Sequence, residues 1–196
     1  MAPRSGGEHP ARLAILSKRP LEFVAVNDAK NNWAVKVTFK ALGTSVGFRN
    51  VHLDWQHLAG HGPAIQQILR ELVERRPCDH EFLLGDFNEP ADGPAARALV
   101  TDPPLSDLTG WRDLGGEAGG EHAAVTVTVG FAGGSREREL GTLFERFDRI
   151  YPSSRRGTPS PRLLGAGVFG QQLANREGIV PSDHLGVFVD LEEAGL

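Results

Sequence analysis

Hydrophobic and polar residues alternate along residues 33–40. The apolar positions are Trp33, Val35, Val37 and Phe39, with mostly lysine and threonine between them. A period of two is typical of a strand with one buried face. Gly43 and Thr44 then predict a turn, after which residues 46–53 return as the partner strand of a hairpin. A short apolar strand is also expected at residues 13–16.

The spacing of apolar residues becomes helical after Pro63, which predicts a helix from there to about residue 75. One face of this helix is apolar, with Ile65, Ile68, Leu69 and Leu72. A second, short helix is expected at residues 93–100. Further strands are expected at residues 81–84, 124–129, 144–151 and 186–191.

Three segments between these elements are rich in glycine, proline or polar residues and are predicted to be loops: residues 101–122, 132–141 and 152–178. The last is a long irregular excursion, and loops of that length are usually functional or disordered. The order of elements predicts one α/β domain over residues 12–196, after a polar lead-in at residues 1–11.

Composition narrows the class of protein. The single cysteine, Cys78, excludes an intramolecular disulfide and is interpreted as a non-catalytic thiol. The net charge of −4 argues against a broad basic surface that wraps duplex DNA. The sequence contains neither an apolar run of membrane-spanning length nor an apolar segment typical of a signal peptide. An intracellular location, cytoplasmic or nuclear, is therefore expected, and the oligomeric state is left open.

Four short segments place polar or ionisable side chains in or beside apolar strands, where a rigid sheet can hold them in position. They are Val51-His52-Leu53-Asp54, Leu84-Gly85-Asp86-Phe87-Asn88, Arg146-Phe147-Asp148-Arg149-Ile150-Tyr151 and Pro181-Ser182-Asp183-His184.

Asp86 and Asn88 lie two residues apart, so in extended backbone their side chains point the same way. A carboxylate can orient a water molecule, and a neighbouring carboxamide can donate a hydrogen bond to a phosphoryl oxygen. An Asx turn that ends a strand explains the same residues about equally well.

His184 has a side chain suited to acid–base chemistry near neutral pH. A carboxylate from Asp148 on one ring nitrogen would fix its tautomer and raise its basicity. The alternatives are a capped turn with a surface histidine and an ion pair between Asp148 and Arg146 or Arg149. His52 is either a phosphate contact or a half-exposed strand residue.

His57 and His61 have the four-residue spacing of a helical metal site. They precede Pro63 in a glycine-containing stretch without an evident third ligand, so they are interpreted as loop residues.

Together, the four segments resemble the late motifs of the endonuclease/exonuclease/phosphatase superfamily, in the correct order over residues 13–191. Phe147-Asp148-Arg149-Ile150 and Pro181-Ser182-Asp183-His184-x-Gly186 are most similar to the 5′-tyrosyl-DNA phosphodiesterase branch. The resemblance implies a four-layer α/β sandwich of the deoxyribonuclease I-like type, with the site at one rim.

The resemblance also implies roles. Asp86 would orient or deprotonate the attacking water, and Asn88 and His52 would contact the phosphate. His184, held by Asp148, would stabilise the phosphorane or move a proton. Asp183 and Asp86 would hold Mg²⁺, with Mn²⁺ as an alternative ion. The implied substrate is a phosphoester, with DNA and RNA among the candidates.

The sequence departs from the family at its start, because members of the family begin with a strand ending in Asn and a strand ending in a metal-binding Gln-Glu. Only 12 residues precede Leu13, and Glu8 lies in a glycine-rich stretch and is not assigned as that ligand. The expectation is a domain truncated at its N-terminus, with an exposed sheet edge or face and weak metal affinity.

Three functions remain open. The first is a metal-dependent phosphodiesterase, and the second is a catalytically impaired remnant that binds a phosphate ligand or a partner. The third, a metal-independent hydrolase that uses Asp148 and His184, lacks a serine nucleophile motif. Arg155, Arg156 and Arg162 are candidate phosphate contacts, or else belong to a solvated basic loop.

Overall fold

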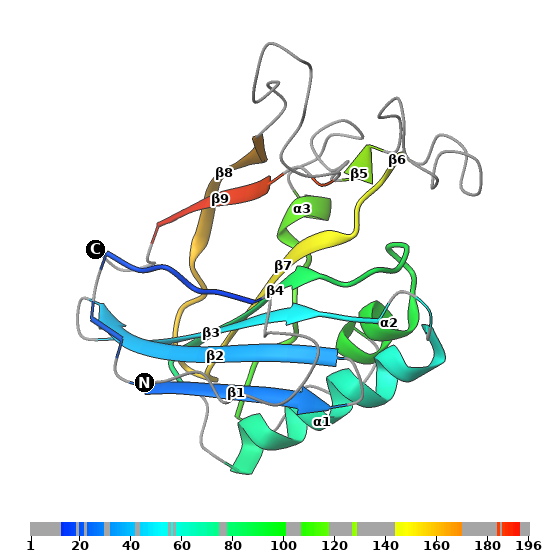
Figure 1. Ribbon diagram of the computed structural model, residues 1–196. Helices are drawn as coiled ribbons and strands as arrows, with labels where there is room; N and C mark the ends of the chain where they lie inside the picture. The colour runs from blue at the N-terminus through cyan, green and yellow to red at the C-terminus, as the bar shows by residue number, and fades with distance from the viewer. Residues whose placement is uncertain are drawn as a thin grey trace.

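Five strands form the main sheet, in the order β1–β2–β3–β4–β7 (Figure 1). They are β1 (Phe23–Ala29), β2 (Asn32–Ala41), β3 (Thr44–His52), β4 (His80–Asp86) and β7 (Asp148–Ser154). β3 and β4 are parallel and all other neighbours are antiparallel. The parallel pair requires a crossover connection, which α1 (His61–Glu74) provides after the single 3₁₀ turn at Leu58–Gly60.

The computed structural model describes residues 13–18, 20–21, 23–29, 32–41, 44–54, 56, 58–74, 78–100, 107–117, 127–128, 144–169, 184 and 186–192. The remaining elements are α2 (Pro94–Val100), α3 (Leu114–Glu117), β5 (Val127–Thr128), β6 (Phe144–Glu145), β8 (Arg162–Phe169) and β9 (Gly186–Glu192). Within this described part of the chain, no helix has the length and apolar character needed to cross a membrane.

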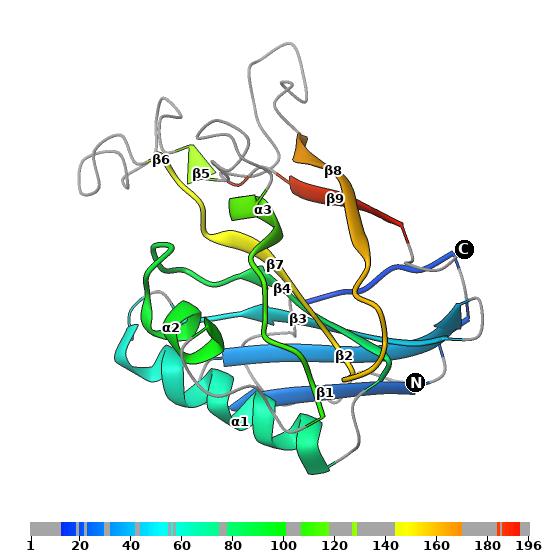
Figure 2. The same ribbon diagram turned by 180° about the vertical axis from the view of Figure 1, so that it is seen from behind.

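The helices α1 and α2 cover one face of the main sheet (Figures 1 and 2). A hydrophobic core lies between them and the sheet. Its buried side chains include Val51, Leu53, Ile65, Leu83, Phe87, Leu99, Leu108 and Tyr151. Phe87 and Tyr151 pack edge to face with ring centroids 5.3 Å apart.

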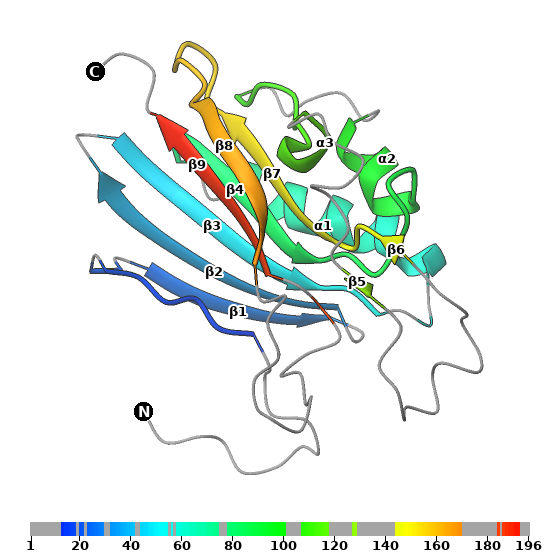
Figure 3. The same cartoon turned by 90° about the horizontal axis from the view of Figure 1, so that it is seen from above.

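A second sheet of β8 and β9 lies across the other face of the main sheet (Figure 3). The helices α1 and α2, the main sheet and the small sheet therefore lie in layers, which is the predicted α/β fold class. A further two-stranded sheet pairs β5 with β6. Large apolar side chains are exposed on the small sheet, with Leu164 55% and Phe169 59% exposed.

The outer edge of β7 is covered by residues 107–112. Thr109 N donates to Ser154 O at 2.7 Å, Arg112 N donates to Pro152 O at 3.2 Å, and Leu108 forms an antiparallel bridge with Arg155. Over residues 152–155 the backbone groups of this edge are therefore paired within the chain, which protects that part of the edge from pairing with another molecule.

Several predicted elements need correction. Residues 13–16 lie outside every strand among the described residues, and Leu16 is 96% exposed. The strand β1 was not predicted, because its first four residues are apolar and its next two polar, without a period of two. The expected strand at 144–151 is divided at residues 146–147, and the expected loop at 152–178 contains the end of β7 and all of β8.

Gly85 fits its place in β4 only because it lacks a side chain. Its φ is +128°, a conformation that L-residues with a side chain rarely adopt. An added Cβ would also meet the carbonyl oxygen of Val51 at 2.1 Å. Gly85 precedes the last residue of β4, so this close approach sets the position of Asp86 beside β3.

We expect Gly85→Ala to destabilise the fold by at least about 2 kcal/mol, because strain and a backbone clash act together. The measurement is urea unfolding. Gly60→Ala is the matched control, since nothing lies within 4 Å of a Cβ there, and its effect should stay within about 0.5 kcal/mol. Equal effects of the two substitutions would contradict this account of Gly85.

Candidate functional site

Three of the predicted site residues stand in one row across three neighbouring strands. His52 ends β3 and pairs in register with Asp86 at the end of β4, and Asp86 pairs with Asp148 at the start of β7. Residues opposite each other on adjacent strands share a face of the sheet. Strand register alone therefore brings these side chains together at one rim of the main sheet.

His184 completes the group from the segment just before β9. Its Nδ1 lies 2.7 Å from Oδ2 of Asp148, which confirms the expected carboxylate–histidine contact. An ionised carboxylate only accepts hydrogen bonds, so Nδ1 carries the hydrogen and Nε2 faces the other side of the site. Nε2 lies 3.9 Å from Oδ2 of Asp86.

The Asp86 carboxylate lies at the centre of this group. Oδ1 accepts a hydrogen bond from the backbone N–H of Asn88 at 2.8 Å. Oδ2 lies between the two histidines, 3.6 Å from Nε2 of His52 and 3.9 Å from Nε2 of His184. His52 is the most open of the three, with 41% of its side chain exposed.

Burial raises the pKa of the Asp86 carboxyl above its ordinary value, and the nearby charge of Asp148 raises it further. The two histidines and the Asn88 N–H act in the opposite direction but do not reverse the shift. A carboxylate with a raised pKa is a stronger base than a solvated one. The site thus holds negative charge that protein groups balance only in part.

Asn88 does not extend the strand as predicted. It has a φ of +48°, and its N–H bond to Asp86 closes an Asx turn, which was the alternative interpretation of these residues. Its Nδ2 donates to Leu53 O at 2.8 Å. Asparagine tolerates this left-handed conformation better than most residues, which accounts for the residue type. The second hydrogen of Nδ2 is left for another acceptor.

The site offers ligands for a cation. Asp86, Asp148 and His184 each present a ligand atom within 4.8 Å of the others. Since His184 already bonds Asp148, the carboxylate oxygens are the better donors, and oxygen donors suit Mg²⁺. Asp183, the other predicted metal ligand, lies outside the described residues.

Behind this row lies a buried charged group that the sequence analysis missed. Glu89, which follows the Gly-Asp-x-Asn motif, is fully buried with His61 and Arg149. The interpretation of His61 as a loop residue was wrong, because it is the first residue of α1 and both its ring nitrogens are bonded. His57 lies outside the described residues.

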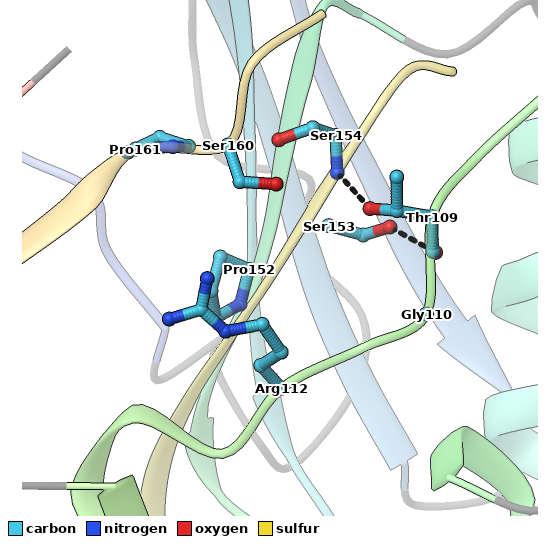
Figure 4. A pocket seen from close by; sticks show the side chains of 8 residues that line it. All are labelled: Thr109, Gly110, Arg112, Pro152, Ser153, Ser154, Ser160 and Pro161. Atoms are coloured by element: carbon cyan, nitrogen blue, oxygen red, sulfur yellow. Dashed lines mark hydrogen bonds between the residues drawn. The ribbon is translucent and has the colours of Figure 1, made fainter. Parts of the chain in front are cut away.

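The proposed arginine contacts lie far from the row. Arg155 follows β7 and pairs with Asp79, roughly 20 Å along the strand from Asp148. Arg162 starts β8 and pairs with Glu192, also away from His184. A small hollow in this region is lined by Thr109, Arg112, Ser153 and Ser160, among others (Figure 4). Thr109 accepts a hydrogen bond from Ser153 there, so the hollow belongs to the packing of the β7 edge.

Comparison with solved structures supports the fold. D. rerio TDP2 humanized by 14 mutations matches with a TM-score of 0.65 and 16% identity, over 88% of this chain and 67% of that chain. D. rerio TDP2 complexed with single-strand DNA product gives 0.63 and 16%, over 88% and 68%. The endonuclease/exonuclease/phosphatase from Bacteroides vulgatus gives 0.57 and 20%, over 83% and 56%.

The chain thus spans between 56% and 68% of these three proteins. At 16% identity, the two TDP2 structures show a shared fold. No curated protein matches the sequence significantly. The Endonuclease/Exonuclease/phosphatase family model, however, matches residues 2–184, nearly the whole chain. On that match and the deoxyribonuclease I-like arrangement of its sheets, the chain belongs to the endonuclease/exonuclease/phosphatase family.

Proposed function

We propose that this chain is a divalent-metal-dependent phosphodiesterase that hydrolyses a phosphoester at the rim of the main sheet. The observation that carries the proposal is the position of Asp86. One oxygen of its carboxylate lies within 4 Å of the Nε2 atoms of two histidines, and one of these histidines is bonded to Asp148. A base, two proton-bearing or phosphate-binding groups and a second carboxylate meet at one point.

Asp86 would orient the attacking water and accept its proton. Its Oδ1 is fixed by the N–H of Asn88, so Oδ2 is the oxygen left to face the water. The raised pKa of Asp86 supports this role, because a more basic carboxylate takes a proton more readily.

His184 would donate a hydrogen bond or a proton to the phosphate through Nε2. The bond from Nδ1 to Asp148 fixes the ring orientation and favours the charged imidazolium as negative charge develops nearby. His52 and the second N–H of the Asn88 amide would contact the phosphoryl oxygens from the neighbouring strand ends.

The described residues fit a hard cation at this site. Two carboxylates, Asp86 and Asp148, are close enough for one to raise the pKa of the other, which a nearby cation would relieve. Asp86 and Asp183 would hold Mg²⁺ or Mn²⁺. When bound, the ion would neutralise charge that develops on the phosphate, as a Lewis acid.

The substrate class that we favour is a phosphoester at the end of a nucleic-acid strand, as in the 5′-tyrosyl-DNA phosphodiesterase branch. Two motifs, one around Asp148 and one around His184, support this choice, and so does the likeness to TDP2. One of those TDP2 structures is complexed with single-strand DNA product.

Asp86→Asn and His184→Ala should each lower kcat by about 10²-fold or more, because each removes a proton-transfer group. The assay is Mg²⁺-dependent hydrolysis of bis(p-nitrophenyl) phosphate and of a 5′-tyrosyl oligonucleotide. Arg162→Ala is the control, since Arg162 is exposed at the far end of β8, and its kcat should equal that of the unmutated chain. If the unmutated chain has no more turnover than Asp86→Asn, it is not an enzyme in this form.

Asp86→Asn should raise the melting temperature near pH 7. Since the pKa of Asp86 is raised in the fold, ionising it destabilises the folded state, and this loss is present above the folded pKa. The loss disappears as pH falls below the unfolded value of about 3.9, so the two melting temperatures should converge there. The control is Asp92→Asn on the exposed surface. A lower melting temperature for Asp86→Asn at pH 7 would refute this description of the site.

Mg²⁺ should raise the melting temperature of the unmutated chain without added substrate, because a ligand of the folded state stabilises it. Asp86→Asn should lose most of this increase, and Arg162→Ala should keep it. The measurement is thermal unfolding across a Mg²⁺ titration. An increase that Asp86→Asn retains would place the cation elsewhere on the protein.

A further inference from the structure

The group formed by His61, Glu89 and Arg149 lies in the interior directly behind the row of site residues. All three side chains are fully buried. Burying charged groups is unfavourable unless each is paired and hydrogen-bonded, and these are. The backbone segments that this group connects indicate its role.

Glu89 is at its centre. Oε2 lies 2.9 Å from Nδ1 of His61 and accepts the Ala95 N–H at 3.0 Å, while Oε1 accepts the Ala96 N–H at 2.9 Å. Oε1 also lies 3.7 Å from Nη1 of Arg149. The two backbone donors tie the carboxylate to the first turn of α2.

His61 extends the group toward β3. Its second ring nitrogen, Nε2, lies 2.8 Å from the carbonyl oxygen of Asp54, two residues after His52. The ring thus contacts two acceptor oxygens, one of a carboxylate and one of a carbonyl, and a doubly protonated ring donates to both. Burial lowers the pKa of His61, but the bonds to Glu89 and Asp54 outweigh it and raise the pKa overall.

Arg149 lies in β7 and connects the group to this strand. Nη2 donates to the carbonyl oxygen of Glu89 at 2.5 Å, and Nε donates to the carbonyl oxygen of Arg146 at 3.0 Å. Arg146 lies two residues before Asp148. Arg149 thus links the segment after β4 to the segment before β7.

On the helix side of the main sheet, the three side chains therefore link three backbone segments. These are the segment after β3, the segment after β4 and the segment before β7. Each lies within three residues of a site residue, His52, Asp86 or Asp148 respectively. The same segments are also joined directly by backbone hydrogen bonds, from Leu53 N to Asp86 O at 3.0 Å and from Phe87 N to Phe147 O at 2.9 Å.

We propose that His61, Glu89 and Arg149 act as positioning residues, a buried brace that fixes the relative placement of His52, Asp86 with Asn88, and Asp148. The consequence for catalysis rests on the proposed function, but the structural effect on the Asp86–Asn88 turn does not. The brace acts through backbone and touches no substrate. A displacement of about 1 Å at reacting groups lowers rates by up to about 10²-fold. A small movement of the brace would therefore be enough to lower turnover at the row.

The first test measures the turn directly by hydrogen exchange. His61→Gln should speed exchange of the Phe87 and Asn88 amides more than that of Leu83 in the middle of β4. Gly93→Ala should do the same without altering the three charges, because its Cβ would lie 2.4 Å from the carboxyl carbon of Glu89. The control is Leu69→Ala, a core change in α1 that should affect all three amides alike.

The second test measures turnover of bis(p-nitrophenyl) phosphate. His61→Gln and Gly93→Ala should lower kcat by about tenfold or more with little change in KM, and Leu69→Ala should leave kcat unchanged below its melting temperature. If His61→Gln does not fold, both tests are made with Gly93→Ala.

The outcomes separate the two proposals. Faster exchange of the turn with lower kcat supports the brace and the function together. Faster exchange in a chain without measurable turnover supports the brace and counts against the proposed function. Exchange in His61→Gln and Gly93→Ala that matches Leu69→Ala overturns the brace, whatever the turnover.

Discussion

Strand register at one rim of the main sheet is the constraint on which this structure depends. β3, β4 and β7 meet so that His52, Asp86 and Asp148 lie side by side, and each is the terminal residue of its strand. Register is fixed by the buried face of the sheet, since a slip of one residue would turn Val51 and Leu83 out of the core. Core packing and the geometry of the site therefore require the same strand register.

Burial of the Asp86 carboxyl raises its pKa, and the neighbouring carboxylate of Asp148 raises it further. His184, the Asn88 N–H and His52 act against this shift from within the row. The buried His61 and Arg149 lie behind the row, where both contact Glu89. A site that destabilises its own fold in this way is typical of catalytic centres.

Much of the site could be predicted from sequence, because its residue types are rare next to apolar strands. The contact of Asp148 with His184 followed from the chemistry of a carboxylate and an imidazole. The turn at Asn88 could not be separated from an extended strand, because Gly-Asp-x-Asn suits both. The register that joins His52 to Asp86 depends on contacts distant in sequence, and no local pattern encodes it.

The buried brace was missed for a different reason. Glutamate, arginine and histidine usually lie at the protein surface. Only the tertiary structure shows that Glu89, Arg149 and His61 are buried and contact one another. For the three candidate arginines, the sequence left a phosphate contact and a solvated basic loop equally open. Strand geometry places Arg155 and Arg162 beside acidic partners, at the ends of β7 and β8 away from the row.

The measurement that tests the central claim most directly is anomalous diffraction from crystals soaked with Mn²⁺ and inorganic phosphate. The account predicts a single strong Mn²⁺ peak within bonding distance of the Asp86 carboxylate, with phosphate between His52, Asn88 and His184. A Mn²⁺ peak elsewhere, with the row at Asp86 free of both ions, would contradict it.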